Sequence, residues 1–303
     1  MRNPIKWKNS DWVCAGLVGV GLCSPCISHS STNVDICQKP TAESHFSIAY
    51  YKSETTSLEG NRGESSREDY SSDFLIKPND NWLVGGGHRS AILNVDDLEL
   101  QTNGYLHTFF FAVHWLNQSD QQGFQISIAP ALSASSNVTS DPDEYTTDAL
   151  QLLVGLTWDR QMSDQLGIRY GVCGDHRFGE YRIYPLVSAH WQPDPDWTIE
   201  IGFPTSQLTH QVTDSLASSL RISPNGNEWY VKDTTLEKDS QVVYEAYALE
   251  WAFNWQAYEH LILTASVARE FDSRYELTLL DEQRVELSND SATRVGFALT
   301  WVF

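Results

Sequence analysis

The sequence is poor in cysteine, in positive charge and in long apolar runs, and each shortage argues against a class of protein. Five cysteines in 303 residues are too few for a disulfide-rich scaffold. Acidic side chains number 40 against 20 Lys and Arg, which gives a formal net charge of −20. Because such a surface repels phosphate backbones, we expect no nucleic-acid partner.

The first thirty residues have the order of a secretory signal peptide. Positive side chains come first, at Arg2, Lys6 and Lys8. An apolar run from Trp12 to Cys23 follows, and small residues continue to Ser30. A spanning helix needs roughly 20 apolar residues, more than this run supplies. We therefore expect residues 1–30 to be a signal peptide that directs export by the general secretory route.

Export would leave two cysteines, Cys37 and Cys173. Two thiols cannot complete a zinc site, and no other metal-ligand spacing is present, so no metal or cofactor is expected. The two could pair with each other in an oxidising compartment, but we expect both to be unpaired. Residues 31–43 are predicted to be a short periplasmic tail, with a plug inside the folded domain as the alternative.

Beyond residue 30 no stretch is apolar enough for a spanning helix, and the dominant signal is a two-residue alternation. Successive side chains of a strand point to opposite faces, so each such segment has one apolar face and one polar or small face. One strand has Leu150, Leu152, Val154, Leu156 and Trp158 on a single face, and the chain ends in Val295, Phe297, Leu299, Trp301 and Phe303.

Three features favour a membrane barrel over a soluble sandwich with the same alternation. The predicted strands run about 10 to 15 residues, which is long for a soluble sandwich, whereas a tilted membrane strand needs roughly 9–11. The chain ends on an aromatic residue, Phe303, as outer-membrane barrels do. The polar faces also carry ionisable groups at mid-strand, which suits a wet lumen. The predicted lumen-lining residues are Asp159, Arg169, Arg182, His190, Glu200, Glu250 and Glu270.

We predict an all-β, transmembrane, antiparallel up-and-down barrel over residues 44–303, with about fourteen strands and twelve as the alternative. Segments 259–271 and 274–281 are assigned as two strands, and 207–215 as a loop. The Ser223–Gly226 segment suits a hairpin, but a hairpin would make the strand number odd. We therefore predict one long strand with a bulge over 216–232.

Aromatic residues gather at one end of the predicted strands. Indole rings favour the headgroup level of a bilayer, where their apolar body and N–H donor are both accommodated. The predicted lipid-interface aromatics are Trp115, Trp158, Trp191, Trp197, Trp229, Trp301 and Phe303.

The aromatic, Pro and Gly positions between residues 182 and 232 are similar to those of a known family. They comprise Arg182-Ile183-Tyr184-Pro185, Trp191-Gln192-Pro193, Trp197, Phe203-Pro204, Ser223-Pro224-Asn225-Gly226 and Trp229. This pattern resembles uncharacterised Gram-negative outer-membrane barrel proteins, a domain of unknown function, and the resemblance covers most of the mature chain. It implies the barrel fold and no activity.

The leading functional hypothesis is a passive, porin-like channel for small solutes in a bacterial outer membrane. The expected partners are outer-membrane lipid, lipopolysaccharide and the barrel-assembly machinery, the last through Phe303. A non-conducting structural or binding barrel is the first alternative. A lipid hydrolase is the second, because Ser188 and His190 share a face and Glu200 is on the next strand. We expect lumen-lining roles for these three and no enzyme activity.

Two further motifs are given structural interpretations. Gly85-Gly86-Gly87 lacks the spacing of a nucleotide site, so we expect a strand kink or close packing inside the barrel. The acidic stretch from Asp141 to Glu144 departs from the EF-hand pattern, so we expect a solvated loop.

Overall fold

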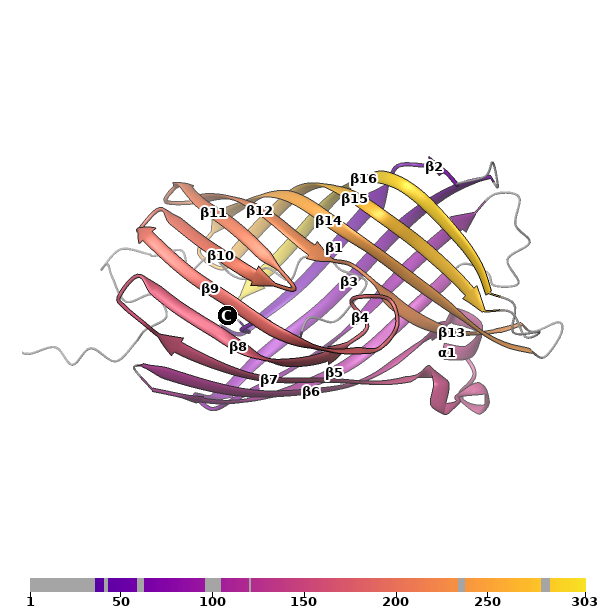
Figure 1. Ribbon diagram of the computed structural model, residues 1–303, viewed down its shortest axis with the longest axis horizontal. Coiled ribbons are helices and arrows are strands. Elements are labelled where there is room, and N and C mark those ends of the chain that lie inside the picture. Colours follow the sequence, from indigo (N-terminus) through magenta and orange to yellow (C-terminus); the bar gives the residue numbers. More distant parts are fainter. Residues whose placement is uncertain are drawn as a thin grey trace, which may run out of the picture.

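The computed structural model describes residues 36–40, 43–58, 63–95, 105–119, 121–233, 238–278 and 284–303. These residues fold into one closed β-barrel with long, tilted strands (Figure 1). Within them, no helix is long and apolar enough to cross a membrane. The predicted signal peptide, residues 1–30, lies outside the described residues.

Fourteen strands form the wall, each antiparallel to its neighbours, and β1 pairs with both β16 and β3 to close the circle. This confirms the predicted fold and strand number. The wall strands are β1 (His45–Ser53), β3 (Glu64–Asn79), β4 (Trp82–Val95), β5 (Tyr105–Gln118), β6 (Gln122–Ser135), β7 (Leu150–Gln161), β8 (Leu166–Asp175), β9 (Arg182–Asp194), β10 (Trp197–Phe203), β11 (Ser206–Thr213), β12 (Leu216–Pro224), β14 (Lys238–Tyr258), β15 (Leu261–Thr278) and β16 (Arg284–Val302).

Five short elements complete the described fold. The two-residue strand β2 (Thr56–Ser57) pairs with β3, and β13 (Asn227–Asp233) pairs with β14 and β6. The link from β6 to β7 contains helix α1 (Ser136–Thr139) and two 3-10 turns, Pro142–Glu144 and Thr147–Ala149.

Two errors in the predicted strands cancel, which is why the predicted number is right. The predicted loop 207–215 contains β11, whose apolar face has only Leu208 and Val212 as aliphatic residues. The predicted strands 259–271 and 274–281 are parts of β15, and the apparent break is a bulge against β14 at Asp272, which has a φ of 53°. Because β11 reverses the direction of all that follows, the link after β13 falls among the long loops.

The wall has an apolar outer face and a small or polar inner face, as the alternation predicts. On β7, Leu150 and Leu152 are exposed on the outside, whereas Leu153 and Thr157 are buried inside. Exposed aromatic and aliphatic side chains continue around the outside, including Phe111, Ile183, Trp251, Phe297 and Trp301. Exposure of so many apolar side chains to water would be unfavourable, whereas the hydrocarbon of a bilayer accommodates them.

One end of the barrel has short turns and the other has long links. Strands β3 and β4 meet at a turn closed by Asn79, whose side chain accepts hydrogen bonds from the backbone N–H groups of Asn81 and Trp82. We call this the short-turn end and the opposite one the long-loop end. The wall is uneven in height, since β14 has 21 residues whereas β10 has 7 and β11 has 8.

Strand β13 narrows the barrel at the long-loop end. Pro224 of β12 pairs with Tyr247 of β14, and Asn227 of β13 pairs with Tyr244 of the same strand. There is therefore no hairpin at Ser223–Gly226, as predicted, but an interruption between two strands that share one neighbour. In Figure 1, β13 lies at the same end as α1, beyond the ends of β9 to β11.

On its other side β13 takes the place of β7 beside β6. Leu132 of β6 pairs with Leu150 of β7, and two residues further on Ala134 forms a parallel bridge with Tyr230 of β13. Strands β7 to β12 end on the short-turn side of this bridge. Fourteen strands thus surround the short-turn half, which we call the wide half, whereas β1, β3 to β6 and β13 to β16 surround the long-loop half. We call these nine strands the narrow ring.

Candidate functional site: the barrel interior

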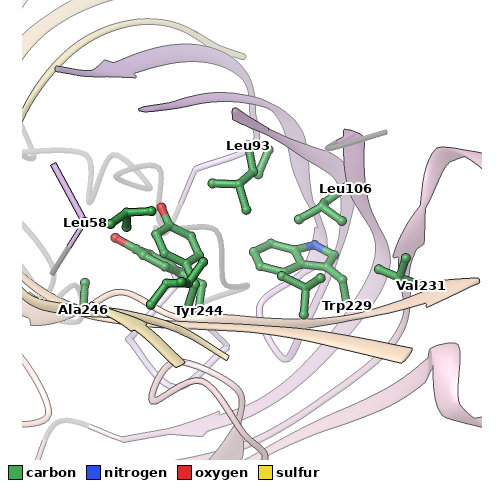
Figure 2. Close-up of a cluster of buried hydrophobic side chains, with 11 residues drawn as sticks. Leu58, Leu93, Leu106, Trp229, Val231, Tyr244 and Ala246 are labelled. Carbon is green, nitrogen blue, oxygen red and sulfur yellow. The ribbon is translucent and has the colours of Figure 1, made fainter. Parts of the chain in front are cut away.

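Apolar side chains fill the narrow ring (Figure 2). Trp229 and Val231 of β13 face Leu93 and Leu106 of β4 and β5, and Tyr244 lies beside them on β14. The cluster comprises Leu58, Ala91, Leu93, Leu106, Trp229, Val231, Val242, Tyr244, Ala246, Tyr275 and Leu287. The straight route along the barrel axis is therefore closed at this level.

The prediction that Trp229 lies at the lipid interface is wrong. The Trp229 side chain is inside the narrow ring and is 3% exposed. The missed strand β11 explains the wrong end, because it reverses the chain and places Trp229 at the long-loop end. The inward face follows from the alternation, since Trp229 is an even number of residues from Ser219 and Arg221, which are buried inside.

Polar contacts fix β13 in the ring. The carbonyl oxygen of Glu228 accepts hydrogen bonds from the Ser133 hydroxyl and the Gln151 amide, both at 2.7 Å. The Asn227 side-chain amide donates to the Thr108 hydroxyl at 3.0 Å. Lys232 forms an ion pair with Glu144, so the acidic stretch Asp141–Glu144 is partly engaged and not only solvated. These contacts tie β13 to three strands and one link.

A network of charged side chains lies inside the barrel next to this apolar cluster. We call it the charge network, and it comprises Arg67, Asp69, Glu250, Glu270 and Arg294. Arg67 contacts Asp69 at 2.9 Å and Glu270 at 3.0 Å, and Arg294 contacts the same Glu270 oxygen at 3.2 Å. Glu250 lies 3.7 Å from Arg294.

The charge network is shielded from water, and aromatic rings and an amide surround it. The Arg67 guanidinium lies 4.0 Å from the centre of the Tyr244 ring, and that of Arg294 lies 5.0 Å from the Tyr51 ring. The Asn225 amide donates to Glu270 at 2.8 Å. Buried charges are tolerated where they are paired in this way, so the network fills space as well as carrying charge.

The sequence-based prediction found only part of this network. Glu250 and Glu270 were predicted to line the lumen, and both side chains are inside the barrel. Arg67, Asp69 and Arg294 were missed. The signal for the first two was present, because Ser65, Arg67, Asp69 and Ser71 alternate with outward residues.

Residues 36–40 lie inside the wide half of the barrel. Ile36 and Cys37 are almost fully buried against residues of β5 to β9 and the link that follows β8. The apolar residues of this cluster are Ile36, Cys37, Ala112, Ala129, Ala131, Leu153, Cys173, Phe178, Tyr184 and Leu186. For the described part of the predicted tail, the plug alternative therefore fits and a position outside the barrel does not.

Cys37 and Cys173 form a disulfide, with their Cα atoms 6.0 Å apart. The prediction that both are unpaired is wrong, because it placed Cys37 outside the barrel and Cys173 within its wall. The Cα separation lies in the ordinary range for a disulfide. Asp175 also lies close to the two sulfur atoms, but their bond to each other leaves no thiolate set for a metal ion.

The link from β8 to β9 folds inward beside the disulfide. Asp175 accepts hydrogen bonds from Arg177 Nε and the Tyr184 hydroxyl, both at 2.8 Å, and its side chain is fully buried. His176 lies 3.1 Å from Glu228 of β13. Gly179 has a φ of 82° and closely approaches Val243 of β14, so the link crosses the interior to reach the far wall.

Polar residues line the remaining part of the wide half, towards the short-turn end. Asp159 and Arg169, which face each other on β7 and β8, form an ion pair at 3.1 Å. Arg169 also donates to Gln125 at 3.0 Å. Glu200 pairs in register with His190, and His190 interacts electrostatically with Glu200, Lys39 and Asp159. The prediction thus identified a group of charges that the structure brings together.

Arg182 and Ser188 differ from the other predicted interior residues. Arg182 is the first residue of β9 and pairs in register with Asp175, whereas His190 lies further along the strand opposite Gly167, so Arg182 does not join the charges around His190. Ser188 is buried, whereas His190 two residues later is exposed. Between these two described residues there is no hydrogen bond of the kind that a nucleophile and its base require.

The remaining predicted interface aromatics lie on the outer face or at its edge. Trp158, Trp191, Trp301 and Phe303 are exposed, and Trp115 and Trp197 are half-buried. Trp197 stacks on His210 with the ring centres 4.2 Å apart.

Two histidines that are far from any metal spacing in the sequence meet on the outer face. His88 Nε2 and His107 Nδ1 are 3.0 Å apart, and the His88 ring stacks on Phe109.

The glycines at positions 85 to 87 mark close packing between strands, one of the two predicted roles. A Cβ atom on Gly87 would lie 2.3 Å from the carbonyl oxygen of Ser72 on β3.

The strand pairing defines a closed antiparallel β-barrel with an apolar outer face and a partly polar interior. No protein-family model matches the chain, and no curated protein matches it. Among solved structures, the chain is similar to an outer membrane channel from Pseudomonas putida F1. The identity is 8%, the TM-score is 0.45, and 89% of this chain and 98% of the other are covered.

Two further solved structures are similar at the same level. For a bacterial polysaccharide outer membrane secretin the identity is 12%, the TM-score 0.41, and the coverage 86% of this chain and 98% of the other. For the KdgM porin the identity is 9%, the TM-score 0.35, and the coverage 85% and 99%.

Proposed function

We propose that this protein is an outer-membrane barrel that acts as a passive, porin-like channel for small solutes. The observation that carries the proposal is the polar lining of the wide half inside an apolar outer face. Asp159, Arg169, His190 and Glu200 bring charges of both signs to one region, and His190 is exposed there. A wet, charged lumen of this kind favours polar solutes over apolar ones.

The proposed route cannot follow the barrel axis through the narrow ring in this conformation. Trp229 and its neighbours fill that ring. Conduction therefore requires a path around β13 on the side where strands β7 to β12 end, past the inward link between β8 and β9. The channel in this arrangement is closed along the axis, and opening requires the elements that fill the wide half to rearrange.

Planar-bilayer conductance of the refolded protein tests this function. We expect discrete current steps, and we expect Asp159→Asn to shift the reversal potential in a salt gradient towards anion selectivity. The variant leaves the Arg169 guanidinium without its charged partner in the lumen. Correctly folded protein that gives no current steps at any voltage or salt concentration would remove the channel function.

A non-conducting structural or binding barrel is the second candidate. The filled narrow ring and the buried charge network favour it, because both occupy space that an open pore would need. Under this function, variants that truncate Trp229 would change stability and leave the bilayer without current.

The proposal includes the partners expected from the sequence. Outer-membrane lipid and lipopolysaccharide would contact the apolar outer face, and the barrel-assembly machinery would recognise the strand ending in Phe303. Export by the general secretory route would precede assembly. We also propose membership of the uncharacterised Gram-negative barrel family that the residues 182–232 resemble.

A further inference from the structure

The wall of the wide half is recessed where the N-terminal segment lies. Four inward positions on β5, β6 and β7 that face Ile36 and Cys37 have small side chains or none, namely Ala112, Ala129, Ala131 and Gly155. A Cβ atom on Gly155 would lie 3.4 Å from the Ile36 carbonyl oxygen and 3.5 Å from the Cys37 sulfur. The segment is therefore in van der Waals contact with the floor of this recess.

The segment passes from an apolar environment to a polar one within a few residues. Ile36 and Cys37 pack against Leu153 and Phe178. Lys39 interacts electrostatically with His190, in the charged part of the lumen. The segment thus occupies the interior beside the charges that carry the proposed function.

The disulfide joins this segment to β8 across 136 residues of sequence. A short segment loses backbone freedom when it is ordered, and its few apolar contacts have to offset that loss. A covalent bond keeps the segment next to its recess even when those contacts break. Removing the bond therefore removes the main restraint on leaving the lumen.

We propose that residues 36–40 form a plug that the Cys37–Cys173 disulfide locks in the lumen, and that cleavage of this bond raises the conductance. The inference rests on the proposed channel function. In the cleavage step a dithiol gives two electrons and two protons to the bond. Both cysteines become thiols, and the dithiol becomes a disulfide.

Conductance is the first test. Oxidised protein is compared with dithiothreitol-treated protein and with the Cys37→Ser and Cys173→Ser variants. We expect at least a two-fold increase in single-channel conductance or open probability in all three. A Cys37→Ser/Gly155→Leu variant fills the recess, so its conductance should stay high. Heat-modifiable migration confirms that each sample is folded.

Thiol labelling is the second test, and it does not depend on conduction. In folded Cys37→Ser protein, a water-soluble maleimide should label Cys173 within minutes, and peptide mass analysis locates the label. The matched control is Gln207→Cys in a background with serine at positions 37 and 173, because Gln207 faces the lumen on β11 away from the recess.

The two tests separate the possible failures. If Cys173 stays unlabelled while the control position reacts, the segment remains in place without its bond and the plug proposal is overturned. Equal conductance of all conducting samples also overturns it. If Cys173 reacts and no sample conducts, the bond does hold the segment, and it is the channel function that fails.

Discussion

Arg67 on β3 and Glu270 on β15 are 203 residues apart in the sequence, and their side chains meet at 3.0 Å inside the barrel. Both side chains are almost completely shielded from solvent. Removing the Glu270 carboxylate leaves the buried Arg67 and Arg294 guanidinium groups to share Asp69, which is 3.8 Å from Arg294 and a weaker partner for it than Glu270 at 3.2 Å. We predict that Glu270→Ala lowers the free energy of unfolding by about 3–5 kcal/mol, measured by urea titration in lipid vesicles.

The Lys52–Glu68 pair provides the control for this prediction. Its atoms are 2.8 Å apart, but the Lys52 side chain is exposed on the outside of the barrel. Solvent screens such a pair, so Glu68→Ala should leave the unfolding midpoint nearly unchanged. Equal losses in the two variants would mean that the buried network has no special role in stability.

Truncation of Trp229 should destabilise the narrow ring. Trp229→Ala removes a large buried ring from a cluster to which strands on opposite sides contribute, and we predict a loss of about 3–5 kcal/mol. Trp191→Ala, on the outer face, leaves no internal cavity and should cost less. The same urea titration compares them, and a larger loss for Trp191→Ala would contradict the interior position of Trp229.

Acid should weaken the closure between β1 and β16 through Glu54. The backbone N–H of Thr293 donates to the Glu54 carboxylate at 2.7 Å and lowers the pKa of this group below its ordinary value of 4.5, with further help from the Thr293 hydroxyl and Arg269. A lowered pKa means that the ionised form stabilises the folded state above the ordinary value and loses this effect as the pH falls below it.

The test compares wild-type protein with Glu54→Gln between neutral and strongly acidic pH. The difference in melting temperature should be present at pH 7 and shrink as the pH falls below 4.5. Asp80→Asn, at an exposed turn position, is the matched control for the loss of one surface carboxylate. A difference that stays constant with pH would contradict a role for the Glu54 carboxylate.

Phe303 should matter for assembly more than for the stability of the finished barrel. Its side chain is exposed, and its backbone N–H donates to the carbonyl oxygen of Ser44 at 3.0 Å, a bond that any residue could form. We predict that Phe303→Ala slows the appearance of the heat-modifiable form in cells several-fold and leaves its melting temperature unchanged. Phe46→Ala, on the outside of β1, should assemble at the wild-type rate.

The two-residue alternation was sufficient to predict the fold, since it fixes which side chains face lipid and which face the interior. It predicted the inner positions of Asp159, Arg169, Glu250 and Glu270 for the same reason. Strand direction was harder to predict, because polar β11 gave little apolar signal and the bulge at Asp272 split β15.

Contacts across the interior could not be predicted from alternation. The two-residue alternation assigns Arg67 and Glu270 to the inner face. It does not say that they lie at the same level along the barrel axis, which depends on strand tilt and register. The Cys37–Cys173 bond depends on a recess formed by small residues on three strands. A run of small inward residues such as Ala129 and Ala131 was the available signal, and it has meaning only once an occupant is known.

The parallel bridge between Ala134 and Tyr230 divides the wall into two parts that can loosen separately. Because β6 pairs directly with β13, the narrow ring stays hydrogen-bonded even if the hairpins from β7 to β11 lose their pairing. Slow amide exchange should therefore persist in β13 and in the part of β14 at the long-loop end when the amides of β10 and β11 already exchange. The narrow ring would then be the more rigid part of the barrel, and the wall formed by β7 to β12 the more flexible part.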